Sequence, residues 1–200
     1  MALRERKKAQ TRRRISDVAT GLFLARGFDR VSVAEVAEAA DVSKMTVFNY
    51  FPRKEDLMFD RFPEMVELVT AAVRGRQEGE PPVSAIHRML RDLVDRDHPL
   101  GGPRDGDRPF LRTVQDSPAL LARAREFRDE LTTVLTDLTG GDHRAHLTAA
   151  LTVAAWQSVF TTSTRRLLAG APPADLARDH LARLDEAFEA VAHATGPPRT

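Results

Sequence analysis

The chain has 200 residues, of which 42% are hydrophobic and 30% charged, and its net charge is only +1. This length allows one hydrophobic core or two small ones that share an interface. The sequence has no cysteine, which excludes disulfides and thiolate metal sites and is typical of a cytoplasmic protein.

The charges are distributed unevenly along the chain. Residues 1–54 contain twelve Lys and Arg against six Asp and Glu, whereas the remainder contains eighteen against twenty-three. A basic segment of this kind indicates the end of a protein that faces nucleic acid. The longest apolar run, residues 147–160, is interrupted by four polar residues, so we expect neither a signal peptide nor a membrane span.

The first predicted helix carries one apolar stripe and follows a basic arm. Its apolar residues lie at helical spacing from Ile15 to Phe23, and Gly27 is a natural residue to end it. We expect the arm to lie along a DNA backbone or in a minor groove. The basic residues of the arm are Arg4, Arg6, Lys7, Lys8, Arg12, Arg13 and Arg14.

A helix-turn-helix is predicted next. Ser32 and Glu35 have the spacing of a capping box, which opens a short helix. Asp41 tolerates the left-handed conformation that a tight turn needs, and Ser43 caps a third helix that Pro52 ends. This third helix is short enough for its N-terminal end to enter a major groove.

The rest of the chain also has helical periodicity. A long fourth helix is predicted over residues 54–74, with a kink or break near residues 59–62 because Pro63 lies inside it. Residues 98–109 are rich in Gly and Pro and predict a mobile loop. Further helices are expected at residues 83–97, 110–114, 117–138, 142–169 and 174–193.

The residue types of the N-terminal segment suggest specific DNA contacts. We expect the third helix to present residues to base edges, while hydroxyls, backbone amides and cations bind phosphates. Lys54 is expected to open the fourth helix where a phosphate would sit. The candidate DNA-binding residues are Arg12, Arg13, Arg14, Ser32, Ser43, Lys44, Met45, Thr46, Asn49, Tyr50 and Lys54.

Residues 19–57 resemble the DNA-binding domain of the TetR family of bacterial one-component repressors. The matching positions include Gly27-Phe28, Val42-Ser43 and Tyr50-Phe51. Asp41 stands where that family usually has Gly, and Met45 where it has Gly, Pro or Ala. Arg53 replaces the usual capping Ser or Asn. Asp41 suits a turn, and we expect Met45 to influence which operator sequence is bound.

The resemblance implies an all-α homodimer of about nine helices. Residues 1–51 would form the DNA-binding domain with its basic arm, residues 52–195 a ligand-binding and dimerisation domain, and residues 196–200 a disordered tail. Two DNA-binding domains would read a palindromic operator on double-stranded DNA, with half-sites about 34–36 Å apart or a multiple of it. A small lipophilic effector, such as an acyl-CoA-like molecule, would release the repressor by moving the fourth helix.

Two sets of apolar residues are candidates for these roles. In the last helix Leu181, Leu184, Phe188 and Val191 follow coiled-coil spacing, and the expected dimer interface is Leu151, Ala155, Val159, Leu181, Leu184, Phe188 and Val191. Methionine and aromatic side chains suit an adaptable apolar pocket. The candidate pocket residues are Phe59, Phe62, Met65, Met89, Leu93, Phe110, Phe127, Leu131, Trp156 and Phe160.

Other functions are less consistent with the sequence. His143 and His146 lie one helical turn apart beside Asp142, but we expect them to be solvated rather than to bind a metal. No phosphate-binding loop or catalytic triad motif is present, so we predict no enzyme and no cofactor. Two alternatives remain: a DNA-binding regulator whose C-terminal part only dimerises, and a helical small-molecule-binding protein or enzyme with a relic DNA-binding domain.

Overall fold

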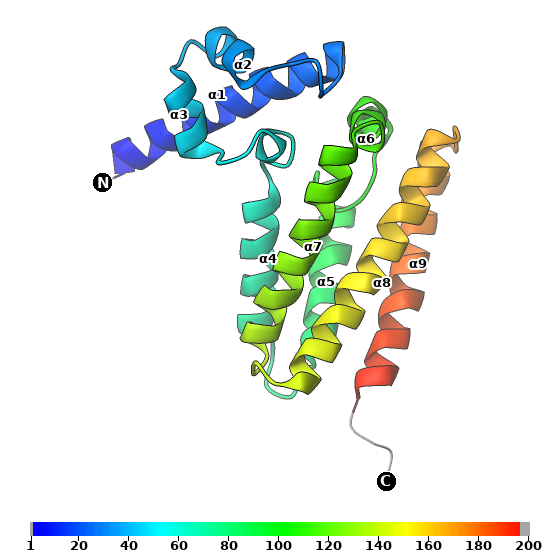
Figure 1. Ribbon diagram of the computed structural model, residues 1–200. Helices are drawn as coiled ribbons and strands as arrows, with labels where there is room; N and C mark the ends of the chain where they lie inside the picture. The colour runs from blue at the N-terminus through cyan, green and yellow to red at the C-terminus, as the bar shows by residue number, and fades with distance from the viewer. Residues whose placement is uncertain (1, 197–200) are drawn as a thin grey trace. The chain divides into compact units, whose positions relative to one another are not determined.

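The computed structural model describes residues 2–196, and the side chains of residues 2, 3, 173 and 174 are not described. The described residues form α-helices and two short 3₁₀-helices, with no strand among them, as predicted (Figure 1). Of the expected tail at residues 196–200, residues 197–200 lie outside the described residues. The elements are α1 (Ala2–Arg26), α2 (Val33–Ala39), α3 (Lys44–Tyr50), η1 (Glu55–Leu57), α4 (Phe62–Arg74), α5 (Pro82–Asp95), η2 (Asp105–Asp107), α6 (Arg108–Gln115), α7 (Pro118–Leu138), α8 (His143–Leu168) and α9 (Pro173–Thr195).

The chain divides into two compact units. The first, here called the head, consists of residues 2–60 and 109–125; the second, the body, consists of residues 61–108 and 126–196. The head therefore extends beyond residue 51, where we expected its domain to end. Leu57, Met58 and Leu120 are buried in its core, which explains why η1, α6 and the start of α7 belong to it.

The head is built around a small apolar core from short segments. Ile15, Ala19 and Phe23 of α1 are fully buried, which confirms the predicted stripe, and Val36 of α2 and Val47 of α3 pack against them. Helices as short as α2 and α3 are not stable in isolation. Their stability therefore comes from this packing and from their caps.

The body consists of longer helices with a larger apolar core. α9 packs against α5 and α8, and α5 packs against α4; these helices run side by side in Figure 1. Val73, Leu93 and Leu184 are among the residues that this core excludes from solvent. The body is thus held mainly by apolar stripes on helices of 13 to 26 residues.

Two helices begin far from the residues predicted for them, whereas the later helices begin within two residues of the prediction. α1 begins at Ala2, so the expected basic arm is part of a helix; its Lys, Arg, Gln and Ala residues all favour helix, and neither Gly nor Pro interrupts residues 2–20. α4 begins at Phe62 and not at residue 54. Pro63 lies in the first turn of α4, where its missing N–H has no partner to lose. Of the kink and the break that we considered, the break is what occurs.

Within residues 2–196, none of the helices combines the length and the apolar character that crossing a membrane requires.

Candidate functional site

The turn between α2 and α3 is a C-terminal capping motif. The Val42 N–H donates to the Ala37 carbonyl at 3.0 Å, and the Asp41 N–H donates to Glu38 at 3.0 Å. Asp41 itself has φ +49°, the left-handed conformation that this motif requires. This confirms the predicted turn residue and fixes the direction in which α3 leaves α2.

The start of α2 has the predicted capping box. The Ser32 hydroxyl accepts from the Glu35 N–H at 3.2 Å, and the Glu35 carboxylate accepts from the Ser32 N–H at 2.8 Å. This backbone N–H, with the nearby Arg26, lowers the pKa of Glu35 from 4.5 to about 2. Ser32 was predicted to contact DNA, but here its hydroxyl maintains the helix start.

α3 is held on one side and exposed on the other. The Ser43 hydroxyl accepts from the Thr46 N–H at 3.0 Å and pairs with the Thr46 hydroxyl at 2.8 Å. Val47 and Phe51 are 1% exposed and fix the helix to the head core. The hydroxyl of Thr46 is thus committed to the cap, whereas other predicted base readers remain on the outer face.

The outer face of α3 combines charged, polar and apolar side chains. Lys44, Met45 and Asn49 are exposed, as a role in contacting bases would require. Phe48 is also exposed, at 39%, and sequence reasoning missed it. The signal was available, because Val47 already occupies the inward position of this turn and Phe48 therefore lies about 100° around the helix from it.

Arg12 serves the structure of the head rather than a free cationic surface. Its guanidinium donates to the carbonyls of Tyr50 at 2.8 Å and Asp60 at 3.0 Å and lies 4.2 Å from the centre of the Phe51 ring. These bonds tie α1 to the end of α3. Tyr50, a predicted phosphate contact, is half-buried and packs against the head core.

Lys54 is committed to internal contacts as well. Its ammonium donates to the Phe28 carbonyl at 2.7 Å and lies 4.1 Å from the centre of the Phe28 ring. Burial lowers the pKa of Lys54 from its ordinary value, although three nearby carboxylates oppose the shift. Lys54 precedes η1 rather than opening α4, so our expectation of a phosphate at that point is not supported.

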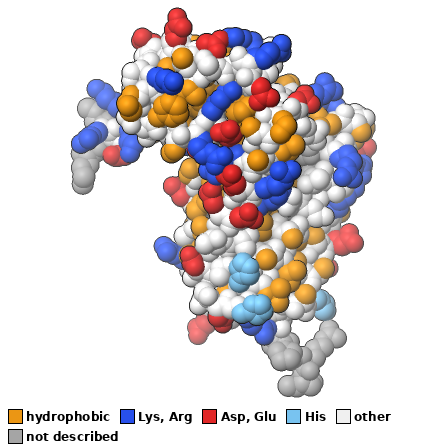
Figure 2. Space-filling model, in the orientation of Figure 1, with side chains coloured by type: hydrophobic (Ala, Val, Ile, Leu, Met, Phe, Trp, Pro, Cys, Tyr) orange, Lys and Arg blue, Asp and Glu red, His pale blue; other side chains and the backbone are white. Residues whose placement is uncertain are grey.

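The N-terminal part of α1 presents a basic surface. Figure 2 shows Lys and Arg side chains gathered at this end of the helix. Apart from Glu5 these charged residues are all cationic, and residues 4–10 are exposed. Arg13 and Arg14 are exposed too. The exposed cations of this basic surface are Arg4, Arg6, Lys7, Lys8, Arg13 and Arg14.

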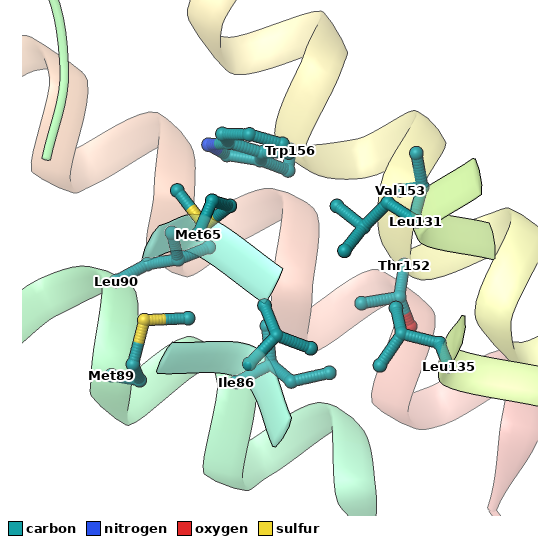
Figure 3. Close-up of a pocket in the computed structure, with 10 residues that line it drawn as sticks. Met65, Ile86, Met89, Leu90, Leu131, Leu135, Thr152, Val153 and Trp156 are labelled. Atoms are coloured by element: carbon teal, nitrogen blue, oxygen red, sulfur yellow. The ribbon is translucent and has the colours of Figure 1, made fainter. Parts of the chain in front are cut away.

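The body contains a narrow apolar pocket between α4, α5, α7 and α8 (Figure 3). Four of the predicted pocket residues line it, namely Met65, Met89, Leu131 and Trp156. The side chains that line the pocket leave room for roughly one water molecule. The lining residues that we did not predict are Val69, Ile86, Leu90, Leu135, Thr152 and Val153.

The other predicted pocket residues are not among those that line this pocket. Phe59 and Phe110 pack edge to face in the head, 6.4 Å between ring centres. Phe62 and Phe127 stack on each other in the body at 3.9 Å. Leu93 is fully buried core. Phe160 is half-buried and, like these, is not among the residues that line the pocket.

Several residues of the predicted dimer interface are buried within the single chain. Leu184 and Phe188 are 0% and 1% exposed inside one chain, and Val159 and Val191 are buried with them. These residues face the body core because α9 packs on α5 and α8 of the same chain. Leu151, Ala155 and Leu181 remain half-buried, so part of each side chain is available to a partner.

Two polar clusters of the body were not predicted. Asp185 of α9 accepts from His87 Nε2 at 2.8 Å and from Arg91, both on α5. His180 is 3% exposed and pairs with the Ser163 hydroxyl at 2.8 Å. Burial lowers the pKa of His180 from 6.5, an effect that a hydrogen bond with the Gly101 backbone opposes. Such partners come from distant segments and leave no local pattern in the sequence.

Metal binding finds no support in the side chains of the described residues. None of them form a group of three or more His, Cys, Asp or Glu arranged around a common point. His143 and His146 are exposed at the start of α8, where Asp142 accepts from the Ala145 N–H at 2.7 Å as the helix cap.

Comparison with known sequences gives a consistent result. Residues 15–71 match the family model described as bacterial regulatory proteins, tetR family. The regulator TcmR of Streptomyces glaucescens is 31% identical over 153 residues, which is 70% of this chain and 65% of TcmR. The chain thus spans just under two thirds of that relative. The regulator LuxR of Vibrio harveyi is 45% identical over 47 residues, 24% of this chain and 23% of LuxR.

Solved structures share the fold over nearly the full chain. FadR of Thermus thermophilus, a transcriptional repressor solved with lauroyl-CoA, has a TM-score of 0.52 at 22% identity, covering 94% of this chain and 96% of FadR. NalD of Pseudomonas aeruginosa, the secondary repressor of a multidrug efflux pump, has a TM-score of 0.54 at 17% identity and covers 92% and 96%. At these identities the likeness concerns the fold.

Proposed function

Because the chain belongs to the TetR family of bacterial regulatory proteins, we propose that it is a DNA-binding transcriptional regulator that represses its target genes. It binds a palindromic operator as a homodimer, and a small apolar effector releases it. The observation that carries this proposal is the outer face of α3, which is exposed, begins with Lys44 and is held rigidly by caps and by Arg12. Proteins bind major grooves with elements of this kind.

Charge supports DNA as the partner of the head. The basic surface of α1 is rich in Lys and Arg that bind phosphates without regard to sequence, while α3 supplies the contacts with base edges. Arg13 and Arg14 directly precede Ile15, the first buried residue of α1, so the same helix that anchors the core also carries them.

The DNA-binding proposal is tested with the DNA upstream of the gene that encodes the chain. Fluorescence anisotropy should show specific binding that weakens as salt concentration rises. Lys44→Ala should weaken this binding, whereas the matched control Arg74→Ala, an exposed cation of the body, should not. Equal affinity for the upstream fragment and an unrelated fragment, or equal losses in both variants, would count against the proposal.

The effector is proposed to enter the apolar pocket of the body. Its lining is apolar apart from Thr152 and the indole of Trp156, which suits a lipophilic molecule such as a fatty acyl chain. FadR, a structural neighbour, was solved with lauroyl-CoA. The pocket as it stands is too small for an acyl chain, so binding requires the flexible side chains of Met65 and Met89 to move.

Trp156 is the only tryptophan of the chain and lines the pocket, so its fluorescence reports directly on binding. Titration with lauroyl-CoA should change the emission of Trp156 and raise the midpoint of thermal unfolding. Leu131→Trp would fill the pocket and should abolish the thermal shift. A shift that persists unchanged in Leu131→Trp would place the ligand elsewhere.

A second candidate is a regulator whose body only dimerises. The observation that favours it is the filled state of the pocket, which leaves room for about one water molecule. It predicts that neither lauroyl-CoA nor shorter acyl chains alter Trp156 emission or DNA affinity. The two candidates therefore differ in a single titration.

The homodimer is proposed to form through the outer face of α8, together with the adjoining surface of α9. Leu147 is 49% exposed, and Leu151, Ala154 and Ser158 follow it at helical spacing with part or all of their surface accessible. Leu147→Glu should raise the dimer dissociation constant in sedimentation experiments. An unchanged constant would exclude this face.

A further inference from the structure

α3 exposes two large apolar side chains that the fold does not need. The large hydrophobic residues classed as exposed among the described side chains are Leu24, Met45, Phe48 and Leu147. Met45 is 69% exposed and Phe48 is 39% exposed, and both lie in a helix of seven residues. Val47, the residue between them, already supplies the buried contact of this turn.

The two side chains share one face of α3. Met45 and Phe48 are three residues apart, so they are neighbours on the helix surface. The ammonium of Lys44 lies 5.9 Å from the centre of the Phe48 ring, at the outer limit of a cation–π contact. Asn49 lies one turn after Met45. The face therefore combines an apolar strip with a cation and an amide, and Figure 2 shows apolar surface on the head where α3 lies.

The surroundings of this strip match a polyanion. Lys44 adjoins it directly, and the exposed guanidiniums of Arg13 and Arg14 belong to the same unit, whose N-terminal helix is strongly basic. An apolar protein partner would leave these cations without counterions. A DNA major groove supplies phosphates at its edges and one apolar group on its floor, the 5-methyl of thymine.

We propose that Met45 and Phe48 read thymine methyl groups, and so require at least one thymine at a defined position in each half-site. This inference rests on the proposed function, because it assigns specificity to the same DNA-binding face. The thioether of Met45 is flexible and adapts to the position of the methyl group, whereas the Phe48 ring gives a flat, rigid contact. Asn49 is left to recognise an adenine or another polar base edge.

Deoxyuridine differs from thymidine only by the absence of this methyl group, so it isolates the proposed contact. The experiment replaces each thymine in turn by deoxyuridine in the upstream duplex that the protein binds, and measures affinity at constant salt. Replacement at one or two positions per half-site should weaken binding by about fourfold each, which is the contribution of one buried methyl or methylene group. Replacement at other positions should have little effect.

Variants assign the effect to the two residues. Met45→Ala and Phe48→Ala should bind more weakly to the thymine duplex and should each lose sensitivity to deoxyuridine at one position. Leu24→Ala is the matched control, because Leu24 is as exposed as Phe48 but lies on α1; it should keep the full sensitivity. Circular dichroism of both α3 variants should match that of the parent chain, since neither side chain is buried.

The possible failures are distinguishable. If the chain binds the upstream duplex with the same affinity when every thymine is replaced, the methyl contact is wrong and the proposed function stands. If replacing thymine by deoxyuridine still weakens the binding of Met45→Ala and Phe48→Ala by fourfold, other residues make the methyl contact and the inference fails. If no duplex is bound at all, the proposed function fails and the inference fails with it.

Discussion

The head and the body use polar side chains in different ways. In the head, polar groups determine where short helices begin and how they are held: Ser32 and Ser43 cap helices, and Arg12 and Lys54 bind backbone carbonyls. In the body, long helices pack through apolar stripes, and polar pairs such as His180 with Ser163 join one long helix to another. The head thus holds one helix rigidly, while the body has an interior that side-chain movement can rearrange.

This difference separates structural cations from functional ones. Arg12 and Lys54 are basic residues of the head, yet both are occupied by carbonyls and aromatic rings of the head itself. Arg13, Arg14 and Lys44 are exposed. Basic residues of the head should therefore fall into two classes in experiments, one that affects folding and one that affects DNA affinity.

The largest expected effect concerns the core of the body. Phe188→Ala should lower the free energy of unfolding by about 3–5 kcal/mol, because it removes a ring that is 1% exposed. Thermal unfolding should show this loss at every protein concentration. Leu147→Ala, at an exposed position, should change the stability of the monomer by less than about 0.5 kcal/mol. If Phe188→Ala weakens dimerisation but does not change the stability of the monomer, Phe188 contributes to the dimer interface and not to the core.

The buried histidine of the body gives the next effect. His180→Ala should lower the free energy of unfolding by up to about 3 kcal/mol at neutral pH, because it leaves the Ser163 hydroxyl without its partner. Burial lowers the pKa of His180, so the unfolded chain binds a proton at a higher pH than the folded chain does. The stability of the parent chain should therefore be complete above pH 6.5 and fall as the pH drops below this value.

Denaturant titrations at a series of pH values measure this dependence. His180→Ala should flatten the decline, whereas the exposed control His143→Ala should preserve it. A decline of the same steepness in His180→Ala and in the parent chain would assign the pH dependence to other groups.

In the head, Lys54 should behave as a structural residue. Lys54→Ala should lower the free energy of unfolding by about 2 kcal/mol, because it removes a charged donor from the Phe28 carbonyl. At temperatures where the variant is folded, its DNA affinity should match that of the parent chain. Lys44→Ala should show the opposite pattern, with unchanged stability and weaker DNA binding. Equal DNA affinities for Lys44→Ala and the parent would remove the distinction between the two lysines.

The smallest effect concerns a cap. Ser32→Ala should lower the free energy of unfolding by about 1 kcal/mol, because α2 then lacks the acceptor for the Glu35 N–H. Ser32→Gly should cost only a few tenths of a kcal/mol. Chemical denaturation of both variants measures the difference. A large loss of DNA affinity in the folded Ser32→Ala variant would instead support the phosphate contact that the sequence suggested for this residue.

Local signals in the sequence were sufficient for most of the head. The spacing of Ser32 and Glu35, the turn at Asp41 and the cap at Ser43 each depend on residues within a few positions of one another. The start of α1 was missed because a run of basic residues was interpreted as an arm, although its composition favours helix. The commitment of Lys54 to Phe28 joins residues 26 positions apart, and no local pattern indicates it.

The body shows why helical periodicity alone does not assign a face. The spacing of Leu184, Phe188 and Val191 correctly predicts a helix that packs along one stripe, but it does not say whether the partner is the same chain or a second copy. Aromatic residues were likewise assigned to one pocket by type, yet Phe59 and Phe110 belong to the head. Both cases concern which segments meet, and only the three-dimensional arrangement determines this.

The salt dependence of DNA binding tests the division between head and body most directly. For the parent chain, the logarithm of the association constant should fall linearly with the logarithm of salt concentration. The double variant Arg13→Ala/Arg14→Ala should have a slope shallower by about 3.6, the value for four lost phosphate contacts, two from each protomer of the proposed dimer. The body variant Arg74→Ala/Arg178→Ala removes the same charge from exposed positions and should keep the parent slope. Equal slopes in all three proteins, or an equal change in both variants, would contradict this account.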